Sequence, residues 1–194
     1  MDNKIRCNWC EKDDLYRRYH DEEWGRPLHD ESKHFEFLLL ETMQAGLSWY
    51  TILVKRENYR QAFANFDPVK VAKYSEDDIN TLMNNAGLVR NRRKLEAAIV
   101  NANKFLEIQA EFGSFDKYIW GFNSNQVVDN KLNDMTNVIT TSELSDRVAK
   151  DMKKRGFKFV GSVTIYAHLQ AIGIINDHLL DCWVRGDMCN LIKN

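Results

Sequence analysis

Helix start and stop signals recur along nearly the whole chain, and they constrain its fold more than any other feature. Apolar residues follow the 3.6-residue spacing of amphipathic helices, and Ser, Asp or Asn precedes most of these segments. Ser32 is the expected cap of the second helix and Asn176 that of the last. With no convincing alternating strand, the sequence predicts an all-α fold with helices over residues 14–20, 33–45, 49–64, 68–73, 76–85, 91–112, 114–122, 142–156, 163–172 and 177–183.

Length and composition favour one folded domain. The 194 residues include only two Pro and nine Gly, so a collagen-like or largely disordered chain is excluded, and we expect residues 1–194 to form a single domain. The 27 Lys and Arg balance 28 Asp and Glu, which excludes a uniformly cationic surface but not a local basic face. Because no signal peptide and no membrane-spanning apolar run is recognisable, we expect a cytoplasmic protein with no membrane partner.

Two Cys and two His near the chain ends form a candidate metal site. His178 and Cys182 are four residues apart on a predicted helix, so they would share one face of it. Cys7 and His20 flank the first predicted helix and would complete a closed, structural zinc site. Alternatively, the thiols are small buried apolar groups and the imidazoles lie at the surface. A redox role for Cys7 and Cys10 is disfavoured because no βαβ pattern surrounds them.

Glu41 lies within the most apolar predicted helix of the chain. A carboxylate in such a place is costly unless it is paired, is hydrogen-bonded or lines a pocket. One interpretation is a glutamate at the helix rim that pairs with a nearby Arg. However, the small-residue turn that follows presents Leu47 and then Trp49. An exposed apolar wedge next to a buried carboxylate and a Trp favours a recognition site over a simple core.

A glycine-centred turn joins two predicted helices over residues 85–94. Its backbone N–H groups precede a helix N-terminus, which is a natural binding place for a phosphate. Basic side chains follow the turn, and a second basic stretch covers residues 150–158. Charge runs are usually solvated faces, but the combination of turn and charge favours contact with nucleic acid. The residues expected to contact DNA here are Gly87, Arg90, Arg92 and Lys94.

Four segments resemble the 3-methyladenine DNA glycosylase I family: YRRYHDEEWG at 16–25, LETMQAGLSW at 40–49, KRGFKFVG at 154–161, and NDH at 176–178 followed by Cys182. The resemblance runs from Cys7 to Cys182 and is thinnest over the Asn-rich residues 123–140. It implies a helix-hairpin-helix DNA glycosylase fold. It also implies base-excision repair by removal of N3-methylated adenine from double-stranded DNA, carried out by a monomer in the bacterial cytoplasm, at the nucleoid.

The resemblance also assigns roles to residues. Cys7, His20, His178 and Cys182 would bind a structural Zn2+ that joins segments 1–25 and 174–190, whereas Cys10 and Cys189 match no ligand of the family. Glu41, the expected catalytic residue, and Tyr16 would hydrogen-bond the extruded base, and Trp49 would stack on it. The remaining implied contacts are an aromatic wall from Trp9 and Tyr19, and Gly46 and Leu47 against the DNA where the nucleotide has left.

Elementary chemistry is consistent with these roles. N3-methylation gives the adenine a positive charge, which aromatic faces and a buried carboxylate attract, and the charged base leaves with little protonation. Enzymes of this fold often place an Asp soon after the hairpin, but here none lies between the hairpin and Asp116. Relatives that cleave the strand place a Schiff-base Lys where Asn91 stands here. We therefore expect a monofunctional glycosylase without lyase activity.

Two other functional classes fit parts of the sequence. A non-enzymatic, zinc-containing module could bind phosphates through residues 90–94, and its DNA binding would not depend on Trp49 or Glu41. A zinc hydrolase would need an open coordination position on the metal, which four protein ligands would exclude.

Overall fold

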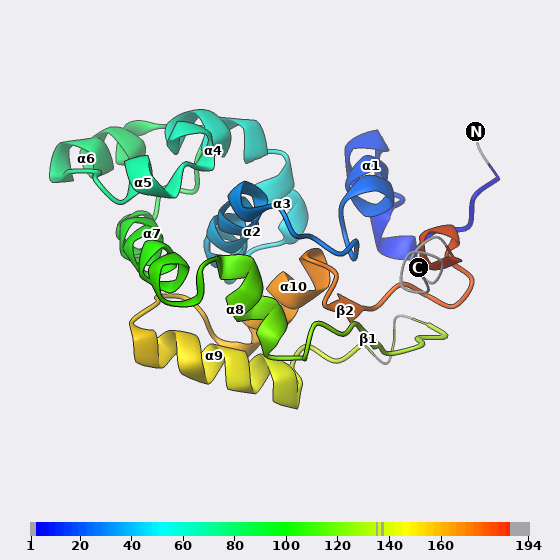
Figure 1. The fold of residues 1–194 in the computed structure, drawn as a ribbon. Coiled ribbons are helices and arrows are strands. Elements are labelled where there is room, and N and C mark those ends of the chain that lie inside the picture. Colours follow the sequence, from blue (N-terminus) through cyan, green and yellow to red (C-terminus); the bar gives the residue numbers. More distant parts are fainter. Residues whose placement is uncertain (1–2, 135, 137, 187–194) are drawn as a thin grey trace.

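The computed structural model describes residues 3–134, 136 and 138–186. This part of the chain is mostly helical, as Figure 1 shows. Its elements in chain order are η1 (Asn8–Cys10), α1 (Asp14–Glu22), α2 (Glu31–Gln44), α3 (Trp49–Leu53), α4 (Arg56–Ala62), η2 (Ala64–Phe66), α5 (Pro68–Val71), α6 (Glu76–Asn84), α7 (Arg92–Phe112), α8 (Phe115–Gly121), β1 (Val128–Asp129), α9 (Glu143–Arg155), α10 (Ser162–Ala171) and β2 (Ile175–Asn176).

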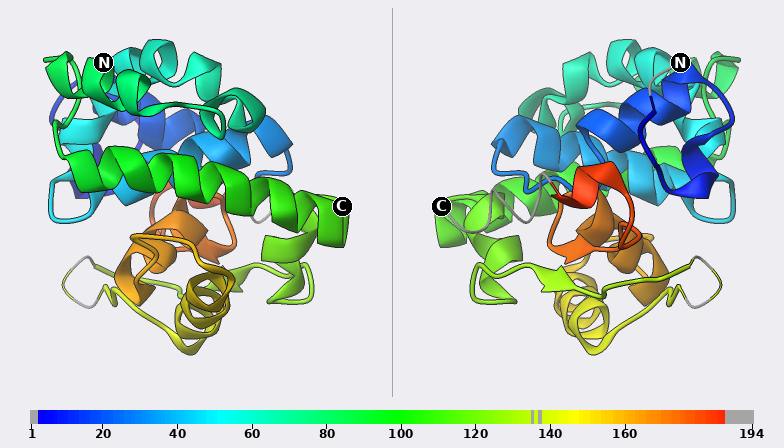
Figure 2. Two further views of the ribbon diagram at one scale, coloured as in Figure 1. Left: turned by 90° about the vertical axis from the view of Figure 1, so that its left-hand side faces the viewer. Right: turned by 90° about the vertical axis from the view of Figure 1, so that its right-hand side faces the viewer.

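Helix α2 lies at the centre of the fold. It contacts α3, α7, α8 and α10, and it is buried without interruption from His34 to Met43. Figure 2 shows the long helix α7 lying between a layer formed by α4, α5 and α6 and a layer formed by α9 and α10. Because α2 is buried on all sides, any polar side chain in its middle, such as Glu41, lies inside the protein.

The two ends of the described chain lie side by side (Figures 1 and 2). The backbone N–H of Trp183 donates to the carbonyl of Ile5 at 3.0 Å. Arg6 forms an ion pair of 2.8 Å with Asp21, at the end of α1. These contacts hold the chain ends against α1 and thereby against the centre of the fold. Among the described residues, no helix has the length and apolarity that crossing a bilayer requires.

Most predicted helices are confirmed, because their end signals are local. Ser75 accepts a hydrogen bond from the backbone of Asp78 and forms a capping box. Ser142 caps α9, and Gly113 ends α7 in the left-handed conformation that glycine adopts without strain. The cap of α2, however, is Asp30 and not Ser32. The Asp30 carboxylate accepts from the backbone N–H groups of two residues, one of them that of Ser32 itself.

The predicted helix over residues 49–64 is wrong, since it is two helices, α3 and α4, with a break at Val54 and Lys55. The first residue of α4, Arg56, donates hydrogen bonds of 2.7 Å to Glu23, which follows α1, and to Glu36 on α2. These ion pairs fix the position of α4 relative to α1 and α2. The sequence of residues 49–64 predicts one continuous helix because the contacts that break it are made with distant residues and cannot be seen in the segment itself.

Two further expectations fail in the segments that connect the helices. β1 and β2 pair in parallel, Val128 with Ile175 and Asp129 with Asn176, although no strand was predicted. Each strand has two residues, too few for an alternating pattern. Asn176 therefore lies in β2 and caps no helix, and residues 177–182 form a turn flanked by irregular chain. The predicted helix over 177–183 is absent from these residues.

Candidate active site and metal centre

A cavity of about 160 Å³ opens beside α1, α2, α3 and α10. It is smaller than the roughly 300–1,000 Å³ of pockets for drug-sized ligands, so it suits a single small ring system. Every residue expected to contact a base lies on its wall, together with four that the sequence did not single out. The lining residues are Trp9, Tyr16, Tyr19, Glu41 and Trp49, and in addition Trp24, Gln44, Ala167 and Gln170.

Sequence patterns could have indicated two of the four additional residues but not the other two. Trp24 and Gln44 lie within two of the segments that carry the family resemblance, so those segments could have pointed to them. Ala167 and Gln170 come from α10, more than a hundred residues further along the chain. Nothing local distinguishes these two, and only the packing of α10 against α2 brings them to the cavity.

Glu41 is the acidic group of the cavity. Its side chain comes from the buried part of α2, and the residue is 3% exposed. Burial raises the pKa of its carboxyl from 4.5 to about 8, because the charged form is poorly solvated there. Within the described residues, Oε2 has no hydrogen-bond partner. A buried polar atom without a partner is uncommon in a folded protein and is available to a ligand.

Aromatic rings form most of the remaining wall. The ring centroids of Trp9 and Tyr16 are 4.9 Å apart, those of Trp9 and Trp24 5.0 Å, and those of Tyr19 and Trp49 5.2 Å. Burial raises the pKa of Tyr16 and, together with the charge of Glu41, that of Tyr19, so both phenols stay neutral. The cavity therefore combines π faces with one carboxyl group, which is a combination that favours a flat cation.

The turn between α2 and α3 lies next to the cavity residues Gln44 and Trp49. Gly46 has φ +79°, and the space around its missing side chain is open. The backbone N–H of Leu47 donates to the carbonyl of Gln44 at 2.7 Å, and the Gln44 side-chain amide donates back to the Leu47 carbonyl. Gln44 thus holds the turn at both ends. Leu47, at its tip, is 37% exposed, as expected for a wedge.

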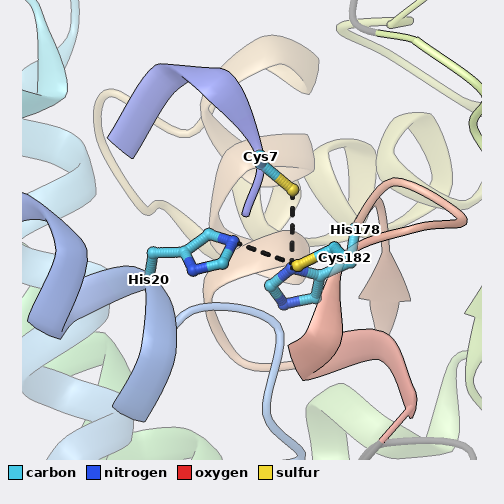
Figure 3. Close-up of side chains that lie close together, drawn as sticks. All are labelled: Cys7, His20, His178 and Cys182. Carbon is cyan, nitrogen blue, oxygen red and sulfur yellow. Dashed lines mark hydrogen bonds between the residues drawn. The ribbon is translucent and has the colours of Figure 1, made fainter. Parts of the chain in front are cut away.

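Cys7, His20, His178 and Cys182 come together in one buried cluster (Figure 3), with ligand atoms within 4.8 Å of one another. Cys182 Sγ lies 3.5 Å from both His20 Nε2 and His178 Nδ1, and Cys7 Sγ lies 3.7 Å from His178 Nδ1. The helical spacing argument was wrong for residues 177–182, yet it named the right pair. A turn, not a helix, brings His178 and Cys182 together.

The cluster fits a tetrahedral zinc ion. With Zn–S bonds of about 2.3 Å and Zn–N bonds of about 2.0–2.1 Å, the S···N edges of a tetrahedron are roughly 3.6 Å, close to the observed separations. The second ring nitrogens are also fixed. His20 Nδ1 donates to Asp21 at 2.8 Å, and His178 Nε2 donates to the Trp24 carbonyl at 3.0 Å. Such outer partners orient the other nitrogen of each ring toward a metal.

The cluster directly supports the wall of the cavity. The ring of Trp9 lies 5.3 Å from that of His20, and the ring of Trp24 lies 4.6 Å from that of His178. Gly25 adds a steric condition, because a Cβ there would lie 2.7 Å from His178 Nε2. The position of the two Trp side chains therefore depends on where the histidines are held.

The turn between α6 and α7 presents Arg90, which is exposed and makes no hydrogen bond or ion pair with any described residue. Gly87 packs closely, because a Cβ there would lie 2.7 Å from Asn58 Cγ. Arg92 is partly exposed and forms ion pairs with Glu76 and Glu96. Of the three cations expected to contact DNA here, Arg90 is thus the one whose charge is not engaged by another described residue.

The structure places Lys94 differently from the prediction. It was expected to meet phosphate, but it is 6% exposed, and its ammonium donates to the carbonyls of Met43 at 2.7 Å and Ala45 at 2.6 Å. These carbonyls end α2, and a cation at a helix C-terminus is stabilising there. Lys94 therefore holds the end of the helix that carries Glu41, and its charge does not reach the surface.

A model of the methyladenine glycosylase family matches residues 9–185, which include every residue of the cavity wall. The chain belongs to this family. Among curated relatives, DNA-3-methyladenine glycosylase of Haemophilus influenzae is 46% identical over 177 residues, covering 91% of this chain and 96% of that protein. DNA-3-methyladenine glycosylase 1 of Escherichia coli is 45% identical over the same length, with coverage of 91% and 95%.

Solved structures of the family agree with this assignment. A crystal structure of 3-methyladenine DNA glycosylase I superposes with a TM-score of 0.89 at 44% identity, covering 92% of this chain and 98% of the other. A Tyr-to-Phe variant of such an enzyme in complex with 3-methyladenine has a TM-score of 0.89 at 40% identity, with coverage of 92% and 96%. Membership in the methyladenine glycosylase family makes this chain a DNA-3-methyladenine glycosylase, an enzyme that hydrolyses a glycosidic bond.

Proposed function

We propose that this enzyme extrudes 3-methyladenine from alkylated double-stranded DNA into the aromatic cavity and hydrolyses its N-glycosidic bond without cutting the strand. The observation that carries the proposal is Glu41, a buried carboxyl with an unpartnered oxygen among aromatic rings. Trp49 stacks on the base, Tyr16 hydrogen-bonds it, and Trp9 and Tyr19 complete the wall. The complex of a relative with 3-methyladenine supports this ligand.

The chemistry depends on charge. A cationic base entering the cavity favours the ionised form of Glu41, whose pKa is raised in the free enzyme by burial alone. The carboxylate then stabilises the positive base and, as the bond breaks, the positive charge that develops on the sugar. Adenine without the methyl group is neutral and gains none of this attraction. Selectivity and catalysis thus arise from the same group.

The test is the release of free 3-methyladenine from methylated duplex DNA by the purified protein. We expect release by the parent protein and almost none by the Glu41→Gln variant. A parent protein that binds DNA with a steep salt dependence but releases no base would instead support a non-enzymatic module. Trapping of a covalent DNA adduct with borohydride would refute the monofunctional mechanism. Lys94 is an unsuitable Schiff-base lysine because two carbonyls of α2 hold its ammonium.

Leu47 is proposed to fill the space that the extruded nucleotide leaves, next to Gly46. We expect Leu47→Ala to lower excision from duplex DNA about tenfold, because the wedge offsets part of the few kcal/mol that base flipping costs. Binding of free 3-methyladenine should not change, since Leu47 is not part of the cavity wall. Leu15→Ala is the matched control, because Leu15 has a similar exposure of 39% on α1. Equal losses in the two variants would contradict the wedge role.

Arg90 is proposed to bind a DNA phosphate beside the Gly87 turn. We expect Arg90→Ala to weaken binding to all sequences alike and to reduce the slope of log affinity against log salt by about 1. Arg92→Ala should change the slope less, because Arg92 is already paired with Glu76 and Glu96. Binding titrations at several salt concentrations measure both slopes, and an unchanged slope in the Arg90 variant would rule out the contact.

The remaining assignments support this role. We propose that the Cys7, His20, His178 and Cys182 cluster holds a structural zinc ion that takes no part in the reaction. It would join segments 1–25 and 174–190 of one domain spanning residues 1–194, with a helix-hairpin-helix formed by α6 and α7. We further propose a monomer that works on DNA in the cytoplasm. Cys189 lies outside the described residues.

A further inference from the structure

Gln170 lines the cavity from α10, and its side-chain amide is held in one orientation. Its Nε2 donates a hydrogen bond of 2.6 Å to Oδ2 of Asp177. Asp177 follows β2 and is 1% exposed. This hydrogen bond places the NH2 end of the amide toward Asp177. The other contacts of Asp177 show that both of its oxygens accept hydrogen bonds.

Asn130 and Tyr166 close the network around Asp177. Asn130 Nδ2 donates to the Tyr166 hydroxyl at 3.1 Å and to Oδ1 of Asp177 at 2.6 Å. The Tyr166 hydroxyl, already accepting from Asn130, donates its own proton to Oδ2 of Asp177 at 2.8 Å. Three donors therefore surround the carboxylate of Asp177. The Gln170 amide cannot turn over without placing two acceptors against each other.

The locked amide leaves its oxygen for the cavity. Gln170 Oε1 makes no hydrogen bond with any described residue, and it is not among the buried atoms that lack a partner. The cavity wall thus offers acceptor groups from two helices that are far apart in the sequence, Glu41 on α2 and Gln170 on α10. Acceptors at Glu41 and Gln170 suit a ligand edge that carries N–H groups.

We propose that Gln170 is a specificity-determining residue that accepts a hydrogen bond from the 6-amino group of the extruded base, and that Asp177 is its positioning residue. The inference rests on the proposed function of the cavity. A 6-amino purine donates at this position, whereas a 6-oxo purine presents an oxygen there. Two facing acceptors disfavour binding, so the cavity rejects 3-methylguanine in favour of 3-methyladenine.

Duplex DNA treated with a methylating agent contains both 3-methyladenine and 3-methylguanine, and chromatography measures the release of both from one reaction. We expect Gln170→Met, which keeps the length of the side chain but removes the amide, to lower kcat/KM for 3-methyladenine about tenfold. Release of 3-methylguanine should stay the same or rise, so the ratio of the two rates falls at least tenfold. Because the ratio is internal to one sample, a loss of folded protein cannot produce this result.

Two more variants test the positioning role. Asp177→Ala removes every acceptor that holds the amide and is expected to lower the ratio, though less than Gln170→Met does. Tyr166→Phe removes one donor to Asp177 without touching Gln170, and it should leave the ratio unchanged. Metal content is measured in each variant, because Asp177 precedes His178. An Asp177→Ala variant that binds metal and has the same ratio of 3-methyladenine to 3-methylguanine release as the parent would overturn the positioning role.

The outcomes separate this inference from the proposed function. If the parent protein releases no 3-methyladenine, the proposed function fails. If the parent releases 3-methyladenine and Gln170→Met keeps the ratio of the parent, only the inference on Gln170 fails. Equal losses of both bases in Gln170→Met would assign the residue a structural role and would likewise overturn the proposal.

Discussion

Glu41→Gln is expected to lower the excision of 3-methyladenine by roughly 100-fold, because it removes a charged hydrogen-bond acceptor of about 2–3 kcal/mol from the cavity. The same substitution should stabilise the free protein at neutral and alkaline pH. Glutamine fills the same volume and carries no charge that would have to be buried. A variant that is more stable but much less active would show that Glu41 serves function at a cost in stability.

The pH dependence of this stability follows from the raised pKa. Glu41 titrates near 8 in the folded protein against 4.5 for an exposed carboxyl, so between these values the folded state holds a proton that the unfolded state has released. The free energy of unfolding therefore falls as pH rises through this range, by up to about 1.4 kcal/mol per unit. The glutamine variant lacks this loss. Its advantage should grow from about pH 5 to pH 8 and then level off.

Urea unfolding at pH 5, 7 and 9 measures this advantage, and single-turnover base release measures the activity. Glu36 provides a matched control, because it is buried on the same helix at 4% exposure but pairs with Arg56 and Arg60 at 2.7 Å. Glu36→Gln should destabilise the protein, since it leaves two cations with a weaker partner, and should spare the chemistry. An advantage of Glu41→Gln that does not change with pH would contradict the raised pKa.

Loss of the metal cluster is expected to have the second large effect. We expect Cys182→Ser to lose the proposed zinc ion, to lower Tm by roughly 10 °C or more and to abolish excision. A structural zinc site contributes on the order of 10 kcal/mol to folding, and a few kcal/mol already move Tm by this much in a protein of this size. Activity falls as well, because His20 and His178 support Trp9 and Trp24 of the cavity wall.

Metal analysis, thermal unfolding and base release are measured on the same preparation. Cys10→Ser is the matched control, because Cys10 is buried nearby but lies outside the cluster, with Sγ 3.1 Å from the Cys7 carbonyl. It should keep one zinc per chain and most of its activity. If Cys182→Ser retained the ion, or if removal of the ion left Tm unchanged, the structural role of the cluster would be wrong.

The sequence predicted the structure best where the role of a residue depends on its neighbours in the chain. Ser75, Ser142 and Gly113 mark helix ends because capping acts within a few residues. The buried carboxyl of Glu41 could be expected because the helix around it is apolar on all sides. The break between α3 and α4 could not, since Arg56 follows partners on other elements.

By itself, then, the amino-acid sequence determined the helical class, the family, five residues of the cavity wall and the four residues of the Cys/His cluster. Only the tertiary structure decided that the Lys94 ammonium binds the carbonyls at the end of α2, and that Gln170 lines the cavity with its amide held by Asp177. The physical reason is range. Capping and periodicity act over one or two turns of chain, whereas a buried polar group takes its role from partners that packing brings from distant parts of the sequence.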